Sequence, residues 1–180
     1  MKKQFLAFIL CLVGFFTAFG QNNDKPVTWK YMVTQASSTE ATLKLTATIA
    51  EGWHMFAIKS GDGFELPTSI EFDPSPNYKL KGKTQEPAPQ TGVDESMGTT
   101  YYCFYNKVTF KQKITIINTT KAFTITGTIT GQACSTMCIL IEENFKFMIR
   151  PYLGKLDNKI GIKLVNLGDN SHHHTTSHIL

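Results

Sequence analysis

The amino-acid sequence predicts an all-β fold, a sandwich of two sheets that forms a single domain. Apolar residues alternate with polar ones through most of the chain, which is the pattern of strands with one buried face. Short segments rich in glycine, proline, asparagine and aspartate separate these runs. No stretch beyond residue 20 keeps an apolar period of 3.6 residues, so no helical layer is expected.

Each expected strand can be recognised by its apolar side. In "EATLKLTATIA", residues 40–50, the side chains of Leu43, Leu45, Ala47 and Ile49 share one face. The same alternation recurs at Val108, Phe110, Ile114 and Ile116, at Phe123, Ile125 and Ile129, and at Phe145, Phe147 and Ile149. Turns are expected at "EGWH", "GDG", "DPSPN" and "INTTK".

The first 20 residues have the order of a secretory signal peptide. Lys2 and Lys3 precede an apolar run, and small residues lead up to Gly20, after which we expect cleavage. The apolar run has about 15 residues, fewer than the roughly 20 that span a bilayer. We therefore expect export, with no stable membrane insertion after the signal is removed.

The rest of the chain divides into a domain over residues 21–152 and a poorly ordered tail over residues 153–180. One more strand near residues 160–165 is expected before the histidine-rich end, which we exclude from the functional site. Within the domain, "EPAPQTGVDESMGTT", residues 86–100, has no periodicity and is expected to be a long polar loop. Loops of this length in compact domains often carry function.

Charge and motifs exclude several classes of function. The chain has 18 Lys and Arg against 14 Asp and Glu, and its lysines are spread singly along the strands, so we expect no nucleic-acid binding. There is no Ser/His/Asp order, no phosphate-binding glycine loop and no convincing carboxylate pair. Turnover of a small molecule is therefore unsupported, and we expect neither a cofactor nor a resident metal.

Two cysteines stand three residues apart in "TGQACSTMCILI", between expected strands. If Cys134 and Cys138 flank a tight antiparallel turn, their Cα atoms lie about 4.5 to 5.5 Å apart, which permits a disulfide. In an exported protein such a bond can be a structural staple or a redox centre. Zinc lacks a four-ligand set, whereas Cu(I) could use Cys134, Met137 and Cys138, completed by Met97 or His54. The spacing alone leaves staple, redox centre and copper site open.

The order of several motifs resembles a known family. "EGWHMFA", "LPTSIEF", "VDESMG" and "ITGTITGQAC" follow one another as in the N-terminal periplasmic domain of the thiol:disulfide interchange protein DsbD, over about residues 25–151. The resemblance implies an immunoglobulin-like sandwich in the periplasm of a Gram-negative-type bacterium. It also implies electron transfer with protein-disulfide reductase chemistry, of the kind that serves cytochrome c assembly. The implied partners are thioredoxin-like periplasmic oxidoreductases and a DsbD-type membrane electron donor.

The same resemblance implies roles for individual residues. Cys134 and Cys138 match the redox pair, and Cys138 is the cysteine expected to form mixed disulfides with partners. Asp94, Glu95 and Met97 match a cap over the pair, while His54 and Phe56 fall beside it. Without the resemblance, His54 is a half-buried strand histidine, Met97 anchors a loop, and Asp94 and Glu95 are solvated.

The chain also departs from the family. The spacer "STM" is shorter than usual, "ILIEE" stands where prolines are common, and no membrane or thioredoxin-like domain follows Pro151 among the 180 residues. The electron source is therefore left open. Cys103, among aromatic residues of an expected strand, is predicted to be a buried free thiol without a catalytic role. The alternatives are a binding module with a structural disulfide and a Cu(I)-handling envelope protein.

Overall fold

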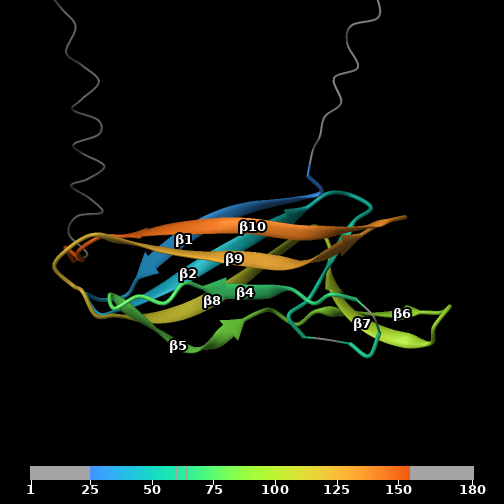
Figure 1. Cartoon of the computed structure of the whole chain (residues 1–180), viewed down its shortest axis with the longest axis horizontal. Helices are drawn as coiled ribbons and strands as arrows, with labels where there is room; N and C mark the ends of the chain where they lie inside the picture. The colour runs from blue at the N-terminus through green and yellow to red at the C-terminus, as the bar shows by residue number, and fades with distance from the viewer. Residues whose placement is uncertain (1–24, 60, 64, 155–180) are drawn as a thin grey trace, which may run out of the picture.

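A computed structural model of the chain describes residues 25–59, 61–63 and 65–154. These residues form ten strands packed as two sheets, so the all-β prediction is confirmed (Figure 1). Across these ranges, no helix is long and apolar enough to cross a membrane. The predicted signal peptide and the strand expected near residues 160–165 lie outside the described residues.

The two sheets are antiparallel. The four-stranded sheet has the order β1-β2-β8-β5, and the six-stranded sheet has the order β10-β9-β3-β7-β6, with β4 also paired to β9. The strands of the first sheet are β1 (Val27–Gln35), β2 (Glu40–Ile49), β8 (Lys107–Ile116) and β5 (Tyr78–Gln85). Those of the second are β10 (Cys138–Ile149), β9 (Phe123–Cys134), β3 (His54–Phe56), β7 (Thr99–Phe104), β6 (Gln90–Asp94) and β4 (Ser69–Phe72).

The core between the sheets is built from the predicted alternating residues. Leu43, Leu45 and Ala47 of β2 are fully buried, and they face inward together with Phe110 of β8. The ring of Phe110 lies 6.2 Å from that of Trp29 and 6.0 Å from that of Phe104, measured between centroids. Burial of such side chains is the main term that favours folding.

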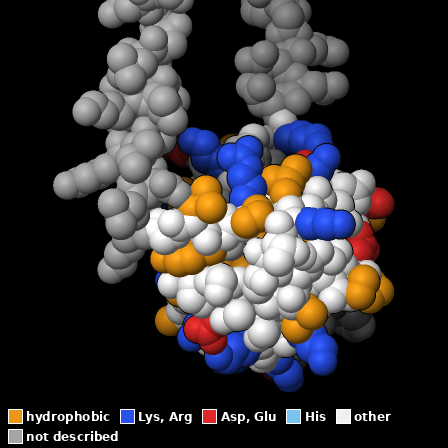
Figure 2. Space-filling view, turned by 90° about the vertical axis from the view of Figure 1, so that its left-hand side faces the viewer, with side chains coloured by type: hydrophobic (Ala, Val, Ile, Leu, Met, Phe, Trp, Pro, Cys, Tyr) orange, Lys and Arg blue, Asp and Glu red, His pale blue; other side chains and the backbone are white. Residues whose placement is uncertain are grey.

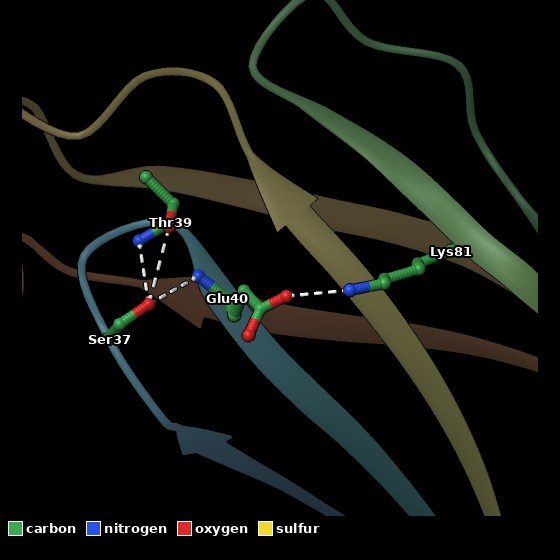
Figure 3. Close-up of polar contacts among 4 residues, drawn as sticks. All are labelled: Ser37, Thr39, Glu40 and Lys81. Carbon is green, nitrogen blue, oxygen red and sulfur yellow. Dashed lines mark hydrogen bonds and ion pairs between the residues drawn. The ribbon is translucent and has the colours of Figure 1, made fainter.

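The turn between β1 and β2 is closed by side-chain hydrogen bonds (Figure 3). Ser37 Oγ accepts hydrogen bonds from the backbone N–H groups of Thr39, at 3.2 Å, and Glu40, at 3.1 Å. Lys81 of β5 reaches across β8 to the Glu40 carboxylate at 2.7 Å, and this contact lowers the pKa of Glu40. Both side chains are exposed, so the ion pair adds little to stability.

The prediction of a long loop over residues 86–100 is wrong. The segment contains all of β6, a turn, and the start of β7, so it forms a β-hairpin. β6 is an edge strand whose five residues are all exposed or half-buried, so its sequence does not show the alternation of a strand with one buried face. Residues 94–98 form the turn, which we call the cap turn because it matches the cap of the family.

Candidate functional site

The two spaced cysteines form a disulfide at the tip of the β9–β10 hairpin. Cys134 ends β9, Cys138 begins β10, and the two residues pair directly, with Cα atoms 4.0 Å apart and a Cys134–Cys138 bond of 2.00 Å. This confirms the predicted tight antiparallel turn, although the Cα atoms are closer than expected. The Ser135 N–H donates to the Met137 carbonyl at 2.8 Å and closes the turn.

The two cysteines differ in exposure. Cys134 is only 4% exposed and belongs to a buried cluster with Phe56 and Cys103, whereas Cys138 is exposed. A protein that approaches this end of the sandwich therefore meets Cys138 and not Cys134.

A pocket of about 600 Å³ opens beside the disulfide, at the end of the sandwich where the β6–β7 hairpin lies (right in Figure 1). All the site residues named from the sequence line it: Cys134, Cys138, His54, Phe56, Asp94, Glu95 and Met97. Sequence reasoning missed the other lining residues, which are Glu65, Val93, Ser96, Thr99, Tyr101 and Gln132. The cysteine tip and the cap turn thus face a common space.

Short strand β3 places aromatic side chains next to the disulfide. His54 pairs with Cys134 of β9, and Phe56 pairs with Cys103 of β7, so His54 and Phe56 point to the same side of the sheet. Tyr101 covers both: its ring stacks on His54 with centroids 5.6 Å apart and meets Phe56 edge-on at 5.6 Å. Tyr101 is therefore a wall of the pocket.

Burial lowers the pKa of His54 below its ordinary value of about 6.5. The imidazole is consequently neutral at pH 7 and can accept a proton. The unfolded chain binds this proton more readily than the folded chain does. The contribution of His54 to the free energy of unfolding is therefore complete above pH 6.5, and it is lost as the pH falls through the lowered pKa. Between pH 7 and pH 5, urea unfolding should show a larger loss of stability for the wild type than for His54→Gln. Equal losses in the two proteins would contradict the assignment.

Asp94 holds the cap turn together. Its Oδ1 accepts hydrogen bonds from the Ser96 N–H at 2.9 Å, the Ser96 hydroxyl at 2.5 Å and the Met97 N–H at 3.3 Å. These bonds lower the pKa of Asp94. Gly98 follows at φ 66°, a conformation that favours glycine, and its N–H donates to the Asp94 carbonyl at 2.7 Å. Met97 is 53% exposed on the cap side of the pocket.

The β6–β7 hairpin is linked to His54 through Tyr101. Gly92 of β6 pairs with Tyr101, and a Cβ at position 92 would lie only 2.2 Å from the tyrosine ring. Gly92→Ala should therefore push the ring away from His54, expose the imidazole and raise its pKa toward 6.5. An NMR titration of His54 measures this shift. Val93→Ala is the matched control, since Val93 is 60% exposed, and an unchanged His54 pKa in Gly92→Ala would contradict the coupling.

The loop between β3 and β4 contributes Glu65 to the lining of the pocket. Thr68 closes its base, because the hydroxyl donates to the Phe56 carbonyl at 2.5 Å and the N–H donates to the Ala57 carbonyl at 3.0 Å. The Glu86 carboxylate accepts from the N–H groups of Ile58 at 2.7 Å and Lys59 at 2.8 Å. These contacts hold the two ends of the loop, and the Leu66 N–H donates to Gln132 Oε1 at 3.2 Å.

Cys103 is the buried free thiol that the sequence predicts, 1% exposed, with its pKa raised by burial. β3 separates β7 from β9, so Cys103 and Cys134 are two strand spacings apart, about 10 Å. A disulfide requires Cα atoms within about 7 Å. Native reduced protein should therefore react with iodoacetamide at the exposed Cys138, and at Cys103 only after unfolding. Rapid native labelling of Cys103, detected by peptide mass mapping, would contradict this.

Among the described residues, no group of three or more His, Cys, Asp or Glu side chains is arranged to hold a metal ion.

The family model for the N-terminal part of the thiol:disulfide interchange protein DsbD matches residues 25–149. The N-terminal periplasmic domain of ScsB from Proteus mirabilis superposes with a TM-score of 0.54 at 14% identity, over 80% of this chain and 55% of that one. The chain thus spans about half of that relative, and the likeness is one of fold. A comparison with curated proteins found no match.

Two structures from Neisseria meningitidis are also similar at 14% identity, each with a TM-score of 0.42. One is the reduced DsbD N-terminal domain, covering 69% of this chain and 90% of that one. The other is the complex between the DsbD and PilB N-terminal domains, covering 74% of this chain and 91% of that one. The family match spans nearly all the described residues. The chain therefore belongs to the N-terminal domain family of the thiol:disulfide interchange protein DsbD, with its immunoglobulin-like β-sandwich.

Proposed function

We propose that this domain carries reducing equivalents in the periplasm of a Gram-negative-type bacterium and passes them through Cys134 and Cys138 to thioredoxin-like oxidoreductases. The observation that supports this most is the disulfide itself, which joins an exposed cysteine to a buried one beside a pocket rimmed by the cap turn. A bond meant only to stabilise the fold gains little from so short a loop. Membership of a thiol:disulfide interchange family agrees with exchange chemistry.

The proposed reaction begins with the oxidised domain. A thiolate of the electron donor attacks Sγ of Cys138, the Cys134–Cys138 bond breaks, and Cys134 leaves as a thiolate. A second donor thiolate then attacks the donor sulfur of this mixed disulfide and releases Cys138, so that two electrons have entered the domain. Delivery is the reverse: Cys138 attacks the disulfide of the oxidoreductase, and Cys134 resolves the mixed disulfide.

Residues around the pair have supporting roles in this proposal. Neutral His54 of β3 lies directly opposite Cys134 on the neighbouring strand β9, and it is a suitable proton acceptor for a cysteine thiol. Glu95 on the cap turn is a second proton acceptor at the pocket, while Asp94 mainly holds the turn. Phe56 and Met97 supply apolar surface that limits water near the sulfurs. The electron donor is proposed to be a DsbD-type membrane protein.

Exchange with a thioredoxin tests this function. Oxidised protein is mixed with a stoichiometric amount of reduced thioredoxin, quenched with acid, and alkylated with a mass-tagged maleimide. We expect the Cys134–Cys138 disulfide to be reduced within seconds while the thioredoxin becomes oxidised. The same protein with dithiothreitol shows whether the bond is reducible at all. A disulfide that dithiothreitol reduces but thioredoxin leaves intact would contradict the proposal and favour a structural staple.

A further inference from the structure

The outer face of the four-stranded sheet gathers lysines that are scattered in the sequence. In β2 and β8, buried residues alternate with outward-facing ones, and the register sets Lys44 opposite Lys111. Lys81 of β5 likewise lies opposite Lys113 of β8. We call this surface the basic face; its lysines are Lys30, Lys44, Lys79, Lys81, Lys107, Lys111 and Lys113.

Acidic residues are nearly absent from the same strands. Glu40 is the single acidic residue within β1, β2, β5 and β8, and it is already paired with Lys81 (Figure 3). By contrast, Glu65, Asp94 and Glu95 line the disulfide pocket at one end of the sandwich. The opposite end shows Lys and Arg side chains among hydrophobic ones, with a few acidic side chains between them (Figure 2). Within the described residues, the basic face therefore lies on a different sheet from the acidic residues of the pocket.

The arrangement of these lysines does not help the fold. Like charges directly opposite on neighbouring strands destabilise a sheet, and two such pairs occur here, Lys44 with Lys111 and Lys81 with Lys113. Apart from Lys81, the lysines of the basic face have no ion-pair partner among the described residues. Glu40 offsets the charge of Lys81 and Lys113, whereas Lys44 and Lys111 face each other without an ion-pair partner among the described residues. A surface with such excess positive charge is suited to an external anionic partner.

We propose that the basic face docks the domain on a bilayer surface that carries anionic phospholipid headgroups. The face consists mainly of lysines and threonines on a sheet, and lysine is a mobile point charge that suits diffuse negative charge. Protein interfaces instead depend on buried Trp, Tyr and Arg anchors, and no Arg or outward aromatic side chain is present in β2 or β8. Met32, 61% exposed opposite Lys44, adds an apolar contact.

Docking in this way leaves the redox site free. The disulfide lies at a hairpin tip of the six-stranded sheet, whereas the basic face belongs to the other sheet. A membrane-bound domain can thus still present Cys138 to an oxidoreductase or to a membrane-embedded donor. The proposal does not depend on the redox function, since it concerns different residues and a different readout.

Vesicle co-sedimentation tests the proposal with protein purified from an exporting host. We compare the wild type with Lys44→Gln/Lys111→Gln/Lys113→Gln and with a control of equal charge change outside the basic face, Lys121→Gln/Lys146→Gln/Arg150→Gln. At low salt the wild type should bind phosphatidylglycerol vesicles and not phosphatidylcholine vesicles. The basic-face variant should lose on the order of 100-fold in partitioning, and the control less than about 5-fold. Raising salt to about 0.5 M should release the wild type.

Three outcomes would overturn the proposal: no binding of the wild type to anionic vesicles, equal losses in the two triple variants, or equally tight binding to soluble polyglutamate. The last would assign the face to acidic proteins. Thermal unfolding checks whether the basic-face variant still folds. Because the variant removes repulsion between lysines, its melting temperature should be no lower than that of the wild type. Its exchange with thioredoxin should also be unchanged.

Discussion

Replacing Cys138 with serine should abolish disulfide exchange with protein partners, whereas replacing Cys134 with serine should trap a mixed disulfide. Cys138 is exposed, so in Cys134→Ser it can still attack a partner's disulfide, but the domain has no second thiol with which to complete the partner's reduction. In Cys138→Ser the remaining cysteine of the pair is 4% exposed and out of a partner's reach. Non-reducing gels measure the complex that each variant forms with a thioredoxin that lacks its resolving cysteine and whose remaining active-site cysteine is activated as a mixed disulfide with thionitrobenzoate.

The double variant Cys134→Ser/Cys138→Ser is the control for this experiment. It retains Cys103, so any complex that it forms would come from the buried thiol. We expect a complex with Cys134→Ser alone. Trapping by Cys138→Ser as efficiently as by Cys134→Ser would contradict the assignment of Cys138 as the contacting cysteine.

Phe110→Ala should cost about 3 to 5 kcal/mol of unfolding free energy. The ring is fully buried between the sheets and touches Trp29 and Phe104, so its removal leaves a cavity that rigid strands cannot close. That loss is a large part of the roughly 5 to 15 kcal/mol available to a domain. Urea unfolding with the disulfide kept oxidised measures it.

Leu80→Ala provides the comparison, since Leu80 is 47% exposed on edge strand β5. It should cost less than about 1 kcal/mol. A Phe110→Ala protein as stable as Leu80→Ala would show that the core is not centred where the structure places it.

The fold could be predicted because its central strands have one apolar face. Apolar residues such as Leu43, Leu45 and Phe110 alternate with polar ones, and this alternation identifies the buried face from the sequence. The hairpin of β6 and β7 could not be found in the same way, because an exposed edge strand such as β6 has no buried face to reveal it. Gly92 also reads as a loop residue, although it serves to make room for the ring of Tyr101.

The site was only partly predictable. Motifs shared with the family pointed to Cys134, Cys138 and the cap turn as parts of the site, and in the structure these residues line one pocket. Tyr101 and Glu86 escaped notice because their roles depend on which strands and loops lie side by side. The basic face was missed for the same reason: lysines that are isolated in sequence meet only through the register of β2, β8 and β5.

A redox titration of the Cys134–Cys138 pair in glutathione buffers, with alkylation and mass mapping at each poise, tests the central claim most directly. A carrier must be both oxidised and reduced by other proteins, so the midpoint should lie within the range of thiol–disulfide exchangers, about −120 to −270 mV. Cys103 should stay unlabelled under native conditions throughout. A midpoint below about −300 mV would mark the bond as a structural disulfide and contradict the claim.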